Sequence, residues 1–315
     1  MKLSIRELDQ LRYEKPISCL NHCRNILAGN PPKELIPRLL AISGSACRVR
    51  GWNRKALKIL SEAKKIAIER RDYSALGDIY QRLALVISDR GDFERSLELI
   101  GKARTFHHFV MDLPSVGKTL VDEGNMRYYL QQFYRCAAAQ RAALEILHPG
   151  DHSHIFTAHH TLARAFLEVD RLDSALEHAQ EAQQVPIDRM GAHRSRWLEG
   201  EILHRVGRSQ DAAEILSETM KDLIEEKEGD CFFVALDLLR IQLTFDPLLA
   251  YQTARDLCRI TILFEEDSIE WPATVIAALD SVVLAGRRGE GLTEGFLQEV
   301  AKVVQEARKS ARLRA

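Results

Sequence analysis

The chain has 315 residues, of which 46% are hydrophobic and 28% are charged, and this composition is typical of a folded protein rather than a disordered one. Its 44 basic and 45 acidic residues nearly cancel, so no global charge selects nucleic acid or a membrane as the partner. No apolar stretch approaches the roughly 18 residues of a spanning helix, and the first residues lack the apolar core of a secretory signal. We therefore expect a cytoplasmic protein.

The predicted elements are all helices, and they begin with an atypical hairpin at residues 4–13 and 16–28 that ends before Pro31 and Pro32. Five hairpins follow, with helices at residues 33–50 and 53–69, 75–90 and 93–106, 114–130 and 133–147, 153–169 and 172–184, and 190–206 and 209–227. A degenerate hairpin at 231–245 and 248–263 comes next, and helices at 272–285 and 293–312 close the array.

These elements divide the chain into four parts. Residues 1–30 are predicted to form an N-terminal capping hairpin, and residues 31–227 the five repeated hairpins. Residues 228–285 hold the degenerate hairpin and the helix after it, and residues 286–315 a linker and a C-terminal capping helix. Terminal units of a stacked array depart from the repeat because one of their faces meets water.

The evidence for a repeat is a recurring turn with small residues at fixed distances from it. The turns fall at Gly51, Gly91, Gln131, Asp170 and Gly207, in steps of 40, 40, 39 and 37 residues. Seven positions before them lie Gly44, Ala84, Gly124, Ala163 and Gly200, and five positions after them lie Ala56, Ser96, Cys136, Ala175 and Ala212. Two antiparallel helices approach closely only where side chains are small, so the pattern predicts stacked helical hairpins.

The clearest copy runs through Tyr80-Gln81-Arg82-Leu83-Ala84, then Gly91 to Leu97, then Ala103, and it resembles the tetratricopeptide repeat (TPR) family. The resemblance covers residues 33–225, with a step near 40 in place of the family's usual length of about 34. Similar stretched repeats occur in bacterial regulatory proteins of this superfamily. The resemblance implies an all-α, right-handed α-solenoid whose inner wall holds an extended peptide or a helix of a partner protein.

The candidate partner-binding residues lie on the first helix of each hairpin, because that helix lines the inner wall of a solenoid. They are Gln81, Asn125, Tyr128, Tyr129, His160, Arg164, Trp197, Glu201 and His204. An amide such as Asn125 both donates to and accepts from a peptide, whereas Arg164 offers a fork of donors to a carboxylate. Tyr128 and Trp197 supply the large contact area typical of interface hot spots, or else they pack as core between hairpins.

Other motifs favour ordinary structural roles, and we predict no cofactor and no metal. Val116-Gly117-Lys118-Thr119 lacks both the upstream glycine and the strand of a phosphate-binding loop. The histidine-rich stretch at 152–160 has no cysteine nearby, and its neighbours Asp151 and Ser153 resemble helix caps. Cys19 occupies a small-residue packing position of the repeat.

The sequence therefore predicts a non-catalytic interaction module, a regulatory adaptor of the bacterial type, that binds a protein or peptide partner rather than nucleic acid or a membrane. Two alternatives remain open. One is a regulatory subunit of a partner enzyme. The other is a nucleic-acid-binding solenoid that uses the basic segment 48–71. Partner identity and oligomeric state are not specified by the sequence.

Overall fold

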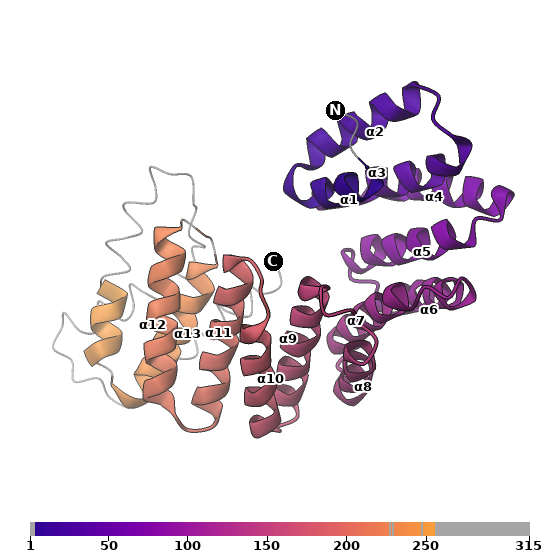
Figure 1. The fold of residues 1–315 in the computed structure, drawn as a ribbon. Coiled ribbons are helices and arrows are strands. Elements are labelled where there is room, and N and C mark those ends of the chain that lie inside the picture. Colours follow the sequence, from indigo (N-terminus) through magenta and orange to yellow (C-terminus); the bar gives the residue numbers. More distant parts are fainter. Residues whose placement is uncertain (1–3, 227, 229, 247, 256–315) are drawn as a thin grey trace. The chain divides into compact units, whose positions relative to one another are not determined.

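The computed structural model describes residues 4–226, 228, 230–246 and 248–255. Within these ranges the elements are thirteen α-helices, one short 3-10 helix and a further helical segment at residues 248–255, with no β-strand (Figure 1). This confirms the predicted all-α fold. The chain divides into two compact units, with unit 1 ending at Ala165 and unit 2 beginning at Phe166.

The helices follow the predicted hairpins closely. Unit 1 contains α1 (Ile5–Glu14), α2 (Pro16–Ala28), the 3-10 helix η1 (Lys33–Leu35), α3 (Ile36–Val49), α4 (Asn53–Arg70), α5 (Tyr73–Ser88), α6 (Phe93–Phe109), α7 (Leu113–Tyr129) and α8 (Phe133–Leu144). Helix α9 (His152–Glu168) spans the division between the units. Unit 2 contains α10 (Leu172–Gln184), α11 (Arg189–Arg205), α12 (Ser209–Glu225) and α13 (Cys231–Phe245), and residues 248–255 are also helical.

The predicted helices at 272–285 and 293–312, with the linker between them, lie outside the described residues, as does the second half of the helix predicted at 248–263. Among the described residues, none of the helices combines the length and the apolar character that spanning a membrane requires.

The turn inside each repeated hairpin contains one residue in the left-handed backbone conformation. The five turn residues identified from the periodicity all have positive φ, namely Gly51 (72°), Gly91 (80°), Gln131 (58°), Asp170 (56°) and Gly207 (92°). A residue in this left-handed conformation ends a helix and reverses the chain, and glycine adopts it without steric cost. The repeated position in the sequence is therefore the left-handed residue of the turn.

Some connections between hairpins use the same left-handed conformation, and Met111, between α6 and α7, adopts it with φ of 57° while it is 78% exposed. A non-glycine residue costs roughly 1 kcal/mol in this conformation, and exposure gives the side chain no packing in return. We expect Met111→Gly to raise the free energy of unfolding by about 0.5–1 kcal/mol, measured by urea denaturation. An unchanged or lowered value contradicts the expectation.

The small residues sit where the two helices of a hairpin touch. A Cβ added to Gly44 meets the Leu60 side chain at 2.6 Å, and one added to Gly200 meets Leu216 at 2.8 Å. Ala84 and Ala163 are fully buried at the equivalent positions of their own hairpins. The predicted packing rule, small residue against the facing helix, is therefore confirmed at the crossings.

Candidate partner-binding surface

Polar side chains connect the first helices of neighbouring hairpins in unit 1. Arg82 on α5 donates to the Ser45 hydroxyl on α3 at 2.7 Å. Gln81 on the same helix donates to Asp122 Oδ2 on α7, also at 2.7 Å. We call this surface the polar wall. It comprises Ser45, Arg48, Gln81, Arg82, Asp122, Asn125, Tyr128, His160 and Arg164.

The N-terminal helix α1 meets one end of the polar wall. Asp9 on α1 forms an ion pair with Arg82 at 2.7 Å, so it shares this guanidinium with Ser45. Helix α1 therefore covers part of the wall near α3 and α5, and the part formed by α7 and α9 lies beyond these contacts.

Asn125 lies between α7, α8 and α9 and uses only one side of its amide. Its Oδ1 accepts from Gln140 Nε2 at 3.1 Å and from the Thr161 hydroxyl at 2.8 Å. No hydrogen bond within the described residues involves its Nδ2. Two bonds at one oxygen fix the orientation of the amide, and the two Nδ2 donors are left for an external acceptor.

Arg164 on α9 is held by an aromatic ring. Its guanidinium lies 4.3 Å from the centroid of the Tyr128 ring, which is a cation–π distance. Arg164 is half-buried, and no carboxylate of the described part of the chain forms an ion pair with it. The ring orients the guanidinium through its face, so the N–H donors at its edge stay available to an anion.

Aromatic side chains continue from Tyr128 toward the hairpin turns. Tyr129 stacks on Phe93 with centroids 4.8 Å apart and nearly parallel planes, and it is 55% exposed. Tyr128 itself makes edge contacts with Tyr129 and with Phe133, at 5.9 and 5.6 Å. These contacts link the turn of one hairpin to the next and place a rigid, partly exposed aromatic surface beside Arg164.

Two carboxyl groups on α5 and α7 are costly to ionise. Burial raises the pKa of Asp122 to about 6, although the hydrogen bond from Gln81 acts in the opposite direction. Burial also raises the pKa of Asp78 to about 6. The Asp78 side chain is 40% exposed and lies 4.0 Å from His107 Nε2. Carboxyl groups with a raised pKa often occur at binding sites, where a cationic group of a ligand favours their ionised form.

The raised pKa of Asp122 makes a prediction about pH. Because the folded protein binds this proton more tightly than the unfolded chain, the contribution of Asp122 to the free energy of unfolding falls as pH rises from about 4 to about 6. Asp122→Asn removes the charge and keeps an acceptor for Gln81. We expect the free energy of unfolding of the variant to exceed that of the parent by about 1–2 kcal/mol above pH 6 and to equal it near pH 4. Urea unfolding at the two pH values measures the difference. A difference that does not change with pH contradicts the assignment.

In unit 2 the three predicted residues share one face of α11. Trp197 is half-buried, donates through Nε1 to Asp237 Oδ2 on α13 at 2.8 Å, and stacks on Phe233 with centroids 6.2 Å apart. His204 Nδ1 lies 3.0 Å from the Ser209 hydroxyl, and burial, with a smaller effect of Arg240, lowers its pKa. Glu201 is half-buried between them on the helix. Trp197 thus has a packing role, whatever it contributes to binding.

The predicted residues divide by what they contact. Asn125, Tyr128 and Arg164 lie together on α7 and α9, with Tyr129 next to Tyr128 and with Gln81 on the same wall. His160 is half-buried, with its ring 5.5 Å from that of Phe156.

The prediction did not include Asp122, which follows Arg82 by one repeat step of 40 residues. That spacing was the signal that could have revealed it.

The histidine-rich start of α9 is organised by an ion pair. Lys118 Nζ lies 2.9 Å from Asp151 Oδ1, so the carboxylate of the residue directly before α9 forms an ion pair with a lysine of α7. Burial, and then the charge of Lys118, lower the pKa of His154 to about 4. The described residues contain no group of three or more side chains suited to a metal ion.

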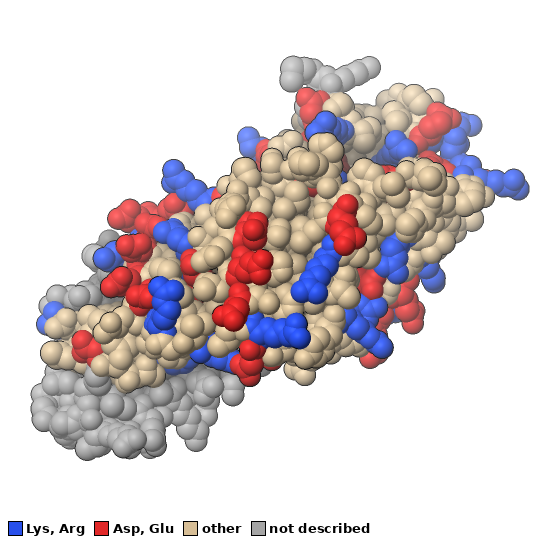
Figure 2. Space-filling view, turned by 60° about the horizontal axis from the view of Figure 1, so that its bottom comes forward, with Lys and Arg blue, Asp and Glu red and all other residues tan. Residues whose placement is uncertain are grey.

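Part of the basic segment 48–71 is already neutralised within unit 1. Arg48 pairs with Asp89 at 3.2 Å, and Arg70 pairs with Glu34 at 2.9 Å. On the face drawn in Figure 2, acidic and basic side chains lie interspersed among uncharged ones, and neither sign covers a large continuous area. A phosphate backbone favours a continuous stripe of basic side chains, so these observations do not favour the nucleic-acid alternative.

Neither protein-family models nor curated protein sequences give a match to this chain. Solved structures are similar to it. The apo form of RapI is 11% identical with a TM-score of 0.65, and the similarity covers 98% of each chain. BtubC from P. vanneervenii is 18% identical with a TM-score of 0.53, covering 69% of this chain and 86% of BtubC. TPR-like repeats of a putative kinesin light chain from Podosopora anserina are 15% identical with a TM-score of 0.51, covering 62% and 97%.

At these identities the similarities establish the fold alone. The chain is a TPR-like α-solenoid, as the repeat predicted.

Proposed function

We propose that this chain is a non-catalytic, regulatory adaptor that binds a segment of a partner protein on the polar wall of unit 1. The observation that carries the proposal is Arg164, a half-buried guanidinium held on the Tyr128 ring with no carboxylate partner among the described residues. The edge donors of this half-buried guanidinium form no ion pair within the described residues, so they can bind a carboxylate of a ligand.

The surroundings of Arg164 suit a peptide. The Nδ2 donors of Asn125 approach from the adjacent helix, which gives the ligand carboxylate or a peptide carbonyl a second donor. Tyr129 adds an exposed, rigid aromatic surface, which favours contact area at low entropic cost. The raised pKa values of Asp78 and Asp122 favour a basic group of the partner nearer to α5. The proposed partner segment therefore carries an acidic group at α9 and a basic group toward α5.

The test is site-specific photocrosslinking in cells. We expect p-benzoylphenylalanine at Tyr129 to capture a discrete partner, and the capture to be lost in the Arg164→Gln background. The same crosslinker at Ala138, an exposed position on the second helix of that hairpin, is the matched control. Once the partner segment is known, Arg164→Gln is expected to weaken its binding by about 1.5–3 kcal/mol. The proposal is overturned if both crosslinker positions capture the partner equally, or if Arg164→Gln leaves the capture from Tyr129 unchanged.

A further inference from the structure

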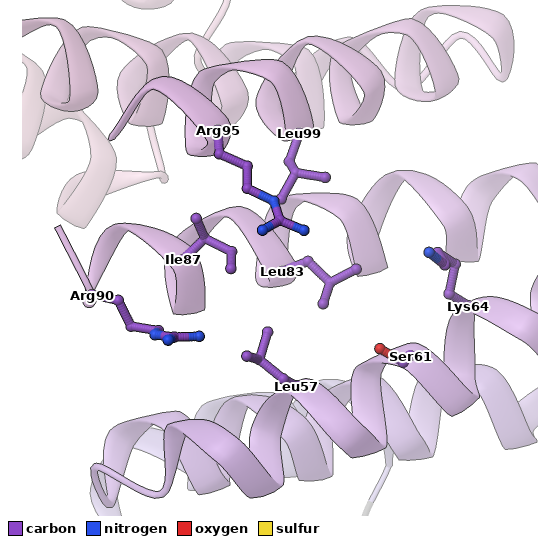
Figure 3. A pocket seen from close by; sticks show the side chains of 8 residues that line it. All are labelled: Leu57, Ser61, Lys64, Leu83, Ile87, Arg90, Arg95 and Leu99. Carbon is purple, nitrogen blue, oxygen red and sulfur yellow. The ribbon is translucent and has the colours of Figure 1, made fainter. Parts of the chain in front are cut away.

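A second surface of unit 1 lies between α4 and α6, over α5, and it is formed by different side chains from the polar wall. It contains a pocket of about 350 Å³ (Figure 3). The lining residues are Leu57, Ser61 and Lys64 on α4, Leu83 and Ile87 on α5, Arg90 in the turn after α5, and Arg95 and Leu99 on α6. Four aliphatic side chains form its apolar part, while three cations and a hydroxyl surround them.

The three cations are not neutralised by the protein. Across the described residues, no carboxylate lies within 4.0 Å of the charged groups of Lys64, Arg90 and Arg95. Other cations of the same unit are paired, for example Arg82 with Asp9 and Arg104 with Glu123. No acidic side chain lines the pocket, so its potential is positive around an apolar surface.

The surface continues along α5 beyond the pocket. Tyr80 lies one helical turn before Leu83, and Lys64 and Lys102 lie 5.9 and 6.0 Å from the centroid of its ring. The Tyr80 ring stacks on Phe106 with centroids 5.7 Å apart. Lys64 belongs both to the pocket and to the Tyr80 site, so the two form one strip. We call it the outer groove, defined by the eight pocket residues together with Tyr80 and Lys102.

We propose that the outer groove binds an acidic amphipathic segment of a partner protein, with leucine-like side chains against Leu57, Leu83, Ile87 and Leu99 and carboxylates toward Lys64, Arg90 and Arg95. Charge complementarity selects this occupant, since four cations border an apolar floor with no internal counter-charge. An amphipathic helix fits because its apolar face repeats at the i, i+3, i+4 spacing of the helices that form the walls. This interaction is separate from that of the polar wall and goes beyond the proposed function.

The probe is a fluorescein-labelled helical peptide of about 15 residues, roughly four turns, with leucines on one face and glutamates elsewhere. We expect Lys64→Glu with Arg95→Glu to weaken its binding at least about ten-fold, measured by fluorescence anisotropy on the full chain. Arg54→Glu with Lys58→Glu is the matched control, because it makes the same change in charge at exposed positions of α4 outside the pocket. That control and Arg164→Gln are expected to bind the peptide like the parent.

Reversal of the probe completes the test. A peptide with lysine in place of every glutamate is expected not to bind the parent protein but to bind the Lys64→Glu, Arg95→Glu variant. Equal loss in the two double variants shows a non-specific charge effect and overturns the proposal. It is also overturned if a scrambled peptide of the same composition binds equally well, or if single-stranded RNA displaces the probe from the groove, since either result assigns the cations to another ligand.

Discussion

Replacing Gly124 by Leu is expected to destabilise unit 1 by about 3–5 kcal/mol, among the largest effects expected in this chain. A Cβ at this position would lie 2.4 Å from Gln140 Nε2 and 2.8 Å from its Cγ. Gln140 is fully buried and donates to the Val121 carbonyl and to Asn125 Oδ1, both at 3.1 Å. A leucine at 124 therefore displaces this buried side chain and breaks its two hydrogen bonds, one of them fully buried.

A matched control for this prediction is Gly101→Leu. Gly101 is also inside an α-helix, but a Cβ there meets nothing within 4 Å. The substitution is expected to be neutral or to stabilise by up to about 1 kcal/mol, because glycine is a poor helix former. Chemical denaturation followed by circular dichroism gives the free energy of unfolding of each variant. Amide hydrogen exchange in α7 and α8 shows whether the loss of stability is located there. Similar stability of the Gly124 and Gly101 variants contradicts the assigned helix crossing.

Gly124 also explains why so much of the fold was predictable from the sequence. Its position relative to Gln131, seven residues later, matches Gly44 with Gly51 and Gly200 with Gly207. Both positions have local physical requirements, a close helix crossing and a left-handed turn, so they recur as residue types. Helix α8 ends at Leu144, before the predicted residue 147, and Leu147 beyond its end lies close to Gly117 of α7. Periodicity does not encode a contact of this kind.

The candidate surfaces were less accessible to sequence reasoning. The repeat step predicts that Asn125 and Arg164 lie on the first helices of neighbouring hairpins. In the structure they lie on α7 and α9, where Asn125 contacts Thr161 and Arg164 contacts Tyr128. The stacking of Arg164 on Tyr128 depends on rotamers, which the step does not determine. The outer groove combines three helices and becomes recognisable only from the absence of carboxylates near Lys64 and Arg95. Ion pairs form only in the folded structure, so the sequence could not predict that Lys64 and Arg95 lack a carboxylate partner.

Trp197 shows the same limit, because the sequence left open whether it binds a partner or packs between hairpins. In the structure its Nε1 donates to Asp237, a fully buried carboxylate on α13, and its ring packs against the apolar cluster of unit 2. A role in packing is therefore present, and a contribution to partner binding stays a prediction. Substitutions at this pair separate the two roles.

Trp197→Phe is expected to destabilise unit 2 by about 2–4 kcal/mol, because it removes a hydrogen bond to a buried charge while keeping most of the ring. Arg240 Nε lies 3.6 Å from the other carboxylate oxygen, at a distance where it offsets only part of that cost. Asp237 therefore contacts both the Trp197 indole and the Arg240 guanidinium inside unit 2.

Adding Asp237→Leu to Trp197→Phe removes both partners of this hydrogen bond, so the combined loss of stability is expected to be smaller than the sum of the two single losses. Denaturant unfolding of the parent, both single variants and the double variant gives the coupling free energy, which we expect to reach about 1–3 kcal/mol. Additive effects would show that the indole–carboxylate bond contributes little and that Trp197 stabilises unit 2 through its ring alone. Partner binding measured on Trp197→Phe then isolates the hot-spot role, because the aromatic surface remains in place.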